Sequence, residues 1–168
     1  ILFRLVGSEM CIRDSSYATL SDVVEYLEWL GEKVERTNNR TKKLTNAAKA
    51  IAAQETSLTE LMINGEDNIK GLKDLEGIQI IGGEKNPNRK GLVSFRIVGS
   101  PSQEIVDFLN VNGIRTHVRK ADHYSGNILN PLGWEDCVRV SVCHYNSSEE
   151  IKSLLLSLNE FQMKLPTN

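Results

Sequence analysis

The hydrophobic pattern of this 168-residue chain changes its period at Gly77. Before that glycine, apolar residues recur every three or four positions, which is the spacing of an amphipathic helix. These residues are Leu20, Val23, Val24, Leu27 and Leu30, followed by Leu44, Ala47, Ala48, Ile51, Leu58, Leu61 and Met62. After Gly77, apolar and polar residues alternate in short runs, as they do in half-buried strands. The pattern predicts an α+β protein in which one or two long helices precede a small sheet.

The ends of the helices can also be predicted. Thr19 or Ser21 is expected to cap the first helix, and Gly31 is expected to end it. A polar loop over residues 32–41 then leads to the second helix, which Gly65 interrupts. A short helical segment is expected through Leu72 and Leu75.

Four alternating runs and two further helices follow Gly77. The strands carry Ile78 and Ile80; Val93, Phe95 and Ile97; Ile114, Thr116 and Val118; and Val138, Val140 and Val142. Capping boxes are expected at Ser100 with Gln103 and at Ser147 with Glu150. The order strand, strand, helix, strand, strand, helix, with short loops, predicts an antiparallel sheet with helices packed on one face.

Composition excludes several classes of protein. A net charge of −2 gives no electrostatic argument for nucleic acid, and no apolar run approaches a membrane span. The three cysteines and three histidines lack metal-ligand spacing, so no metal site is expected. The three cysteines also suggest no disulfide framework, so a reducing compartment, by default the cytoplasm, is expected.

The two ends of the chain differ from the rest. Residues 1–15 contain a short apolar stretch that ends in charge, and they resemble translated sequencing-adapter sequence. We interpret them as a non-native tail, with a native N-terminal segment as the alternative. Residues 16–75 are then a helical link, 76–165 a small α+β domain and 166–168 a tail.

Arginines mark the polar side of two predicted strands. Arg139 alternates with Val138 and Val140, so it stands on the face opposite the core, while Arg115 and Arg119 stand on another strand. A guanidinium held by a rigid element can grip a carboxylate with two parallel hydrogen bonds. The alternative is that this is a solvated sheet face.

The segment that contains Arg139 carries a family resemblance. The string V-R-V-S-x-x-x-Y-N-S-x-E-E, from Val138 to Glu150, resembles the end of the small C-terminal domain of class-V aminotransferases, a pyridoxal-phosphate group that includes cysteine desulfurases. The resemblance extends over about Ser16 to Phe161, including Trp29-Leu30-Gly31 and Ala47 to Glu55. It implies that Arg139 binds the α-carboxylate of an amino-acid substrate.

The loop from Val118 to Ser125 resembles the V-R-x-G-x-H-C loop of cysteine desulfurases. Arg119 and His123 match that pattern, while Tyr124 stands where the cysteine would be. Because a phenol does not accept sulfane sulfur as a thiolate does, the resemblance points to a desulfurase-like subgroup without the nucleophile. Arg119 is then a second substrate-binding candidate, and Tyr124 and His123 are candidates for proton transfer. Tyr124 is equally well explained as a packing residue of a loop.

The resemblance also implies what lies elsewhere. No lysine here matches the family's Schiff-base motif, so pyridoxal 5'-phosphate is expected in a longer, homodimeric parent and is not expected to bind stably to this fragment. The reaction on the amino acid (elimination, transamination or racemisation) stays open. Two alternatives remain: a non-enzymatic α+β module that binds an anion or a protein, and a true cysteine desulfurase that uses Cys137.

If residues 1–15 are derived from an adapter, the genomic reading frame is expected to lack them. Sequencing the gene around the codon for Ser16 checks this expectation. Finding the fifteen residues encoded directly upstream would contradict the interpretation.

Overall fold

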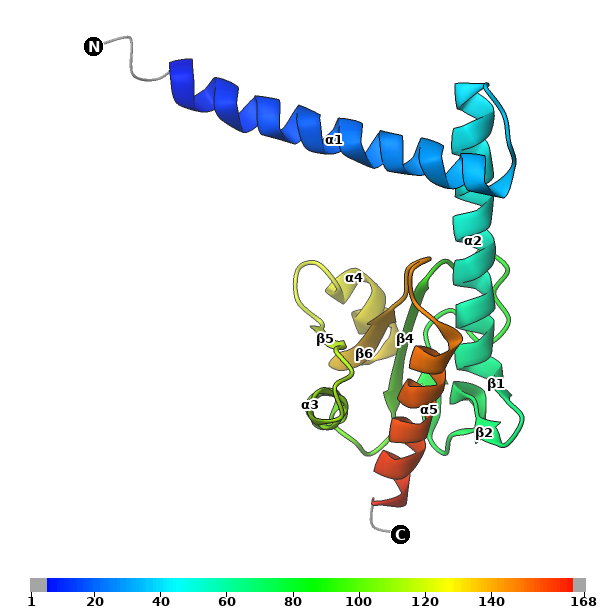
Figure 1. The fold of residues 1–168 in the computed structure, drawn as a ribbon. Coiled ribbons are helices and arrows are strands. Elements are labelled where there is room, and N and C mark those ends of the chain that lie inside the picture. Colours follow the sequence, from blue (N-terminus) through cyan, green and yellow to red (C-terminus); the bar gives the residue numbers. More distant parts are fainter. Residues whose placement is uncertain (1–5, 165–168) are drawn as a thin grey trace. The chain divides into compact units, whose positions relative to one another are not determined.

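A computed structural model describes residues 6–164, with side chains from residue 15 onward (Figure 1). The chain divides into two compact units, Ile1–Ala53 and Gln54–Asn168, which are described separately below. Among residues 6–164, no helix has the length and apolar character that a membrane crossing requires.

The first unit contains α1 (Val6–Val34) and the first half of α2 (Arg40–Asn64). The predicted ends of α1 are wrong at both sides. Thr19 does not cap a helix start, because its hydroxyl donates back one turn to the carbonyl of Ser15 at 2.8 Å. Gly31 does not end the helix either. It is buried within α1, and a Cβ atom there would lie 1.8 Å from the carbonyl oxygen of Lys43.

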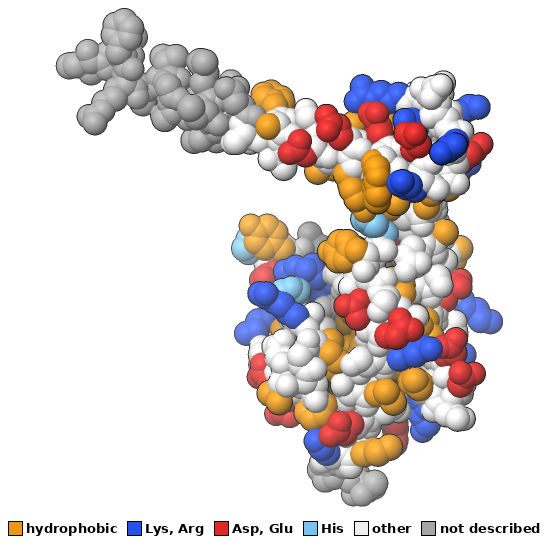
Figure 2. Space-filling model, viewed as in Figure 1, with side chains coloured by type: hydrophobic (Ala, Val, Ile, Leu, Met, Phe, Trp, Pro, Cys, Tyr) orange, Lys and Arg blue, Asp and Glu red, His pale blue; other side chains and the backbone are white. Residues whose placement is uncertain are grey.

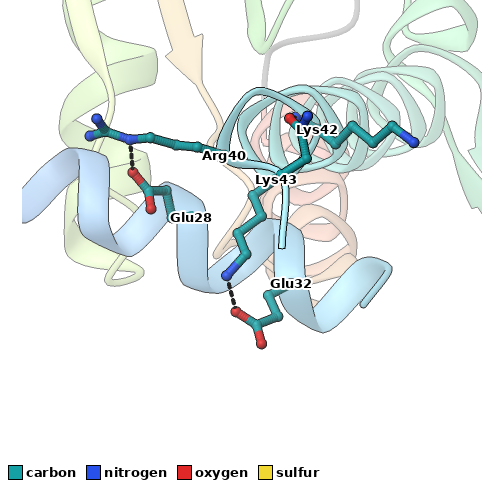
Figure 3. Close-up of polar contacts among 6 residues, drawn as sticks. Glu28, Glu32, Arg40, Lys42 and Lys43 are labelled. Carbon is teal, nitrogen blue, oxygen red and sulfur yellow. Dashed lines mark hydrogen bonds and ion pairs between the residues drawn. The ribbon is translucent and has the colours of Figure 1, made fainter. Parts of the chain in front are cut away.

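Polar contacts join α1 to the first half of α2 (Figure 3). Arg40 pairs with Glu28 and Lys43 pairs with Glu32. One turn further along each helix, the amide of Asn46 donates to Glu35 at 3.0 Å. The ion pair lowers the pKa of Glu32, chiefly through the hydrogen bond from Lys43. Because these pairs are largely exposed, we expect each to contribute little to stability and the glycine contact to set how closely the helices approach.

The second unit is built around a four-stranded antiparallel sheet in the order β3-β4-β6-β5. Its strands are β3 (Ile78–Ile80), β4 (Leu92–Ile97), β5 (His117–Lys120) and β6 (Asp136–Ser141). A two-stranded hairpin precedes it, formed by β1 (Gly65–Glu66) and β2 (Ile69–Lys70), and the 3₁₀ turn η2 (Leu72–Asp74) supplies the predicted short helical segment. The other elements are α3 (Ser102–Val111), α4 (Gly126–Leu129), η3 (Asn130–Leu132) and α5 (Ser148–Met163).

One face of the sheet carries the main core. Phe95 and Val138 are fully buried on neighbouring strands and pack with Leu109 of α3 and Leu155 of α5. Met62, from the second half of α2, joins the same core. The α+β architecture with an antiparallel sheet and helices on one face is therefore confirmed.

A smaller cluster lies on the other face. Leu129 of α4 and Trp134 pack there against Cys137, which points away from the core that contains Val138. The prediction did not include α4, because a four-residue helix is too short to show a hydrophobic period.

Two local predictions need correction. Ser100 does not cap α3: the N-cap is Pro101, without a side-chain hydrogen bond, and the amide of Ser100 instead bonds to the carbonyl of Ile97 at 3.1 Å. The last strand ends at Ser141, so Val142, expected inside it, lies beyond it. Gly113, at a φ of 77°, follows the end of α3.

The capping box of α5 is confirmed. The hydroxyl of Ser147 accepts from the amide of Glu150 at 3.2 Å, and the carboxylate of Glu150 accepts from the amide of Ser147 at 2.8 Å. Asn146 adds a donor to that carboxylate and accepts from the amide of Cys143. The exit from β6 is thus tied to the start of α5.

Replacing Ser147 with Ala is expected to lower the free energy of unfolding by about 1 kcal/mol, because an N-terminal amide of α5 loses its acceptor. Urea denaturation of the chain measures this loss. Ser153→Ala is the matched control, since Ser153 is exposed within the same helix; an equal loss in both variants would contradict the capping role.

The same box predicts a pH dependence. The amide of Ser147, and then the amide of Asn146, lower the pKa of Glu150 below its ordinary value of 4.5. The stabilisation from a carboxylate with a lowered pKa is complete above the ordinary pKa and is lost as the pH falls through the folded-state pKa. Glu150→Gln is therefore expected to flatten the acid side of the stability profile.

Candidate functional site

The sheet register brings two arginines to one face. Arg139 of β6 lies directly opposite Ser94 of β4 on one side and His117 of β5 on the other. Arg119 of β5 lies opposite Cys137, two residues before Arg139. Because side chains alternate along a strand, Arg119 and Arg139 share the face that does not carry the main core.

A cavity of about 540 Å³ opens on this face. The sheet and its edge contribute Ile81, Leu92, Ser94, Arg119, Cys137 and Arg139, and the segment after β5 contributes Tyr124, Ser125, Ile128 and Leu129. The two guanidinium groups are thus surrounded mostly by apolar or neutral side chains. Neither a carboxylate nor a lysine is among the residues that line the cavity.

Arg139 is the most constrained side chain of this site. It is half-buried, and its Nε–H has no hydrogen-bond partner within the described residues. Burial, and secondly the positive charge of Arg119, lower the pKa of Arg139 from its ordinary value. A buried donor without a partner costs about 1–3 kcal/mol. An anion bound in the cavity can supply the missing acceptor.

An Asx turn shapes the loop that follows β5. The carboxylate of Asp122 accepts from the amides of Tyr124 at 2.9 Å and Ser125 at 3.0 Å, which lowers its pKa. The carbonyl of Asp122 also accepts from the amide of Gly126 at 2.7 Å. Tyr124 is held at the edge of the cavity by its backbone, while 80% of its surface stays exposed.

The structure brings three of the four predicted site residues together at one cavity. Arg119, Arg139 and Tyr124 line one cavity, whereas His123 does not. The imidazole of His123 instead lies against the ring of Tyr124, with 3.9 Å between ring centroids. Arg115, which was expected to extend the positive patch, is exposed and outside the cavity lining. Figure 2 shows lysine, arginine and histidine side chains gathered over the part that carries β5 and α4, beside exposed hydrophobic groups.

Sequence reasoning missed two hydroxyl residues of the cavity, Ser94 and Ser125, and named Cys137 only for the alternative of a true cysteine desulfurase. Cys137 precedes Arg139 by two positions, and this shared parity was a usable signal. Ser94 could be found only from the register that sets it opposite Arg139. The apolar wall formed by Ile128 and Leu129 had no signal in the sequence.

Cys137 and Cys143 are buried to different degrees. Cys137 is 2% exposed, and burial, followed by the charge of Asp136, raises the pKa of its thiol above 9.0. Cys143 is half-buried outside β6. Within the described part of the chain, no group of three or more His, Cys, Asp or Glu residues could hold a metal ion.

An α+β unit with an arginine-lined cavity on the open face of its sheet is the architecture expected for the C-terminal domain of a fold-type-I transferase. The sequence profile of the Aminotransferase class-V family matches residues 25–154. The chain belongs to this family.

The curated relatives that the chain matches are named as cysteine desulfurases. A probable cysteine desulfurase of Pseudomonas putida is 32% identical over 113 residues, which are 67% of this chain and 25% of that protein. A cysteine desulfurase of Synechococcus elongatus is 32% identical over 114 residues, 68% of this chain and 17% of that protein. The chain thus spans a quarter or less of the length of these relatives.

Solved structures share the fold. The cysteine desulfurase CsdA of Escherichia coli superposes with a TM-score of 0.57 at 19% identity, over 77% of this chain and 32% of that one. An apo cysteine desulfurase of Thermococcus onnurineus gives a TM-score of 0.58 at 23% identity, over 75% and 30%. At this level of identity the comparison supports the fold class alone.

The raised pKa of Cys137 predicts slow alkylation. At pH 8, iodoacetamide is expected to modify Cys143 at least about tenfold faster than Cys137, because the Cys137 thiol is buried and has a raised pKa, whereas Cys143 is only half-buried. Mass spectrometry of the digested protein measures both rates. Preferential labelling of Cys137 would show that the thiol is activated and would contradict this description of the site.

Proposed function

We propose that this chain is the C-terminal part of a pyridoxal-phosphate enzyme that acts on an amino acid, and that it supplies the side of the active site that binds the substrate carboxylate. In this proposal residues 76–165 are the small domain, and residues 16–75 link it to a large cofactor domain of a homodimeric parent. The observation that carries the proposal is the unpartnered Nε–H of Arg139 at a cavity without acidic residues.

Arg139 is proposed to bind the α-carboxylate. Its guanidinium is planar and can donate two parallel hydrogen bonds to a carboxylate, which fixes orientation as well as position. β6 is hydrogen-bonded on both edges, to β4 and to β5, so the backbone at Arg139 is rigid. The apolar neighbours Leu92, Ile128 and Leu129 limit the water that competes for the charge.

Tyr124 and His123 are proposed to donate or accept protons at the open side of the cavity. The phenol of Tyr124 can donate or accept a hydrogen bond at a substrate atom, and the imidazole beside it has one nitrogen that can donate and one that can accept. Since no thiol stands at position 124, this loop is not expected to accept sulfur from the substrate. Arg119 is proposed as a second substrate-binding residue.

Pyridoxal phosphate would supply the electron sink for chemistry at the amino-acid carbon. The residues described here do not fit the role of holding it, because no lysine lines the cavity to form the Schiff base. We therefore assign the cofactor to the large domain of the parent. The contribution of this chain is to bind and orient the substrate.

Two other functions have some support. The lack of a lysine at the cavity is also compatible with a non-enzymatic module that binds an anion or a protein. Cys137 lines the cavity, as a true cysteine desulfurase built on this chain would require. Its buried thiol with a raised pKa makes it a poor nucleophile, so this second alternative is the weaker one.

In a polypeptide that joins a large pyridoxal-phosphate domain to this chain, Arg139→Ala is expected to raise the KM for the amino acid about thirtyfold or more. This follows from the roughly 2–5 kcal/mol lost when one partner of a buried charged pair is removed. Steady-state kinetics measure the change.

Arg115→Ala is the matched control, because it removes the same charge from outside the cavity and is expected to leave KM unchanged. Unchanged kinetics in the Arg139 variant would remove that residue from substrate binding. The lack of cofactor absorbance in the joined protein, with both domains folded, would favour the binding module.

A further inference from the structure

Two arginines line the cavity, and no acidic residue of the lining neutralises them. A single carboxylate would neutralise only one of the two charges. Arg119 and Arg139 lie on adjacent strands and both line the cavity. The positive charge of Arg119 is the second cause, after burial, of the lowered pKa of Arg139, so the two guanidinium groups are close enough to repel each other. A bound monoanion would leave one of these charges uncompensated.

The other half-buried arginines of the second unit have partners inside the protein. Arg89 donates through Nη2 to the carbonyls of Ile81 and Gly83. Arg96 donates to Gln79 at 2.9 Å, and its guanidinium lies 4.4 Å from the centre of the Trp134 ring.

Arg119 and Arg139 differ from both, since neither makes a hydrogen bond or an ion pair in the described region. They also differ from surface lysines such as Lys152 and Lys164, which are paired with glutamates. Among the half-buried arginines of the second unit, the two without a hydrogen bond or ion pair are thus the two that line the cavity.

The nearest candidate counterion is already engaged. The carboxylate of Asp122 feels the charge of Arg119, but the amides of Ser125 and Tyr124 are the larger causes of its lowered pKa. Its Oδ1 accepts from both of those amides, and the residue does not line the cavity. A ligand is therefore left to neutralise the two arginines.

We propose that the substrate carries two carboxylates: an α-carboxylate bound by Arg139, and a second carboxylate on its side chain bound by Arg119. This inference rests on the function proposed above and narrows its substrate to an acidic amino acid. The apolar residues Ile81, Ile128 and Leu129, which line the same cavity, fit the methylene groups that separate two carboxylates. Ser94, opposite Arg139, offers a further hydroxyl to the bound acid.

The test uses the 168-residue chain itself and two probes of equal carbon number. Glutarate has two carboxylates and pentanoate has one, so their comparison isolates the second charge. At constant ionic strength, NMR titration of the ¹⁵N-labelled chain is expected to show glutarate binding at least about tenfold more tightly than pentanoate. The largest shifts are expected at the amides of Ser94, Arg119 and Arg139.

Matched variants separate the two arginines. Arg119→Gln is expected to weaken glutarate to the level of pentanoate and to leave pentanoate unchanged, while Arg119→Lys retains part of the preference. Arg139→Gln is expected to weaken both probes. Arg115→Gln, which removes an exposed charge outside the cavity, is expected to change neither. The dispersion of the amide spectrum shows whether each variant is folded.

The outcomes distinguish this inference from the function on which it rests. Equal affinity of the wild-type chain for both probes, with pentanoate lost in Arg139→Gln, overturns the inference and leaves the proposed function standing. Pentanoate binding that survives Arg139→Gln in a folded protein overturns the proposed function. Equal loss of glutarate in Arg115→Gln and Arg119→Gln, or no shift of the cavity amides by glutarate, also overturns the inference.

Discussion

The antiparallel pairing of β6 with β4 on one edge and β5 on the other is the constraint on which the site depends. Val138 is fully buried between Phe95 and Val118, which lie directly opposite it on the two neighbouring strands. Burial of that side chain holds the strand in register, and the alternation of side chains then turns Arg139 to the opposite face. A shift of one residue would bury the guanidinium in the core, so the apolar packing that stabilises the sheet also orients the charge.

The second half of the chain could be predicted well, because its local signals agree with its tertiary contacts. The valines around Arg139 alternate without exception, and Ser147 with Glu150 forms the expected box. Elsewhere, local signals were overridden. Ser100 had the sequence of a cap, but its backbone is used by a bridge to Ile97. Gly31 had the sequence of a helix end, but it provides room for the backbone at Lys43, a contact that no local pattern reveals.

Some residues of the cavity could be predicted from local sequence, and others only from the tertiary structure. Arg139, Arg119 and Tyr124 were found from one strand, one loop and a family resemblance, and Cys137 follows from parity alone. Ser94 and the wall formed by Ile128 and Leu129 required the register and the path of α4. Family membership supports the fold, while the combination of two arginines without internal partners in largely apolar surroundings is a property of this chain that the comparisons do not describe.

The turn at Asp122 fixes the backbone of its loop without using the side chain of Tyr124. Every contact that holds the turn runs to a main-chain amide, and the phenol of Tyr124 takes part in none of them. The backbone conformation at position 124 therefore does not depend on the phenol. A side chain with a hydroxyl, a thiol or a small apolar group is compatible with the same turn. A substitution at this position would change the group presented at the edge of the cavity and leave the hydrogen bonds of the turn in place.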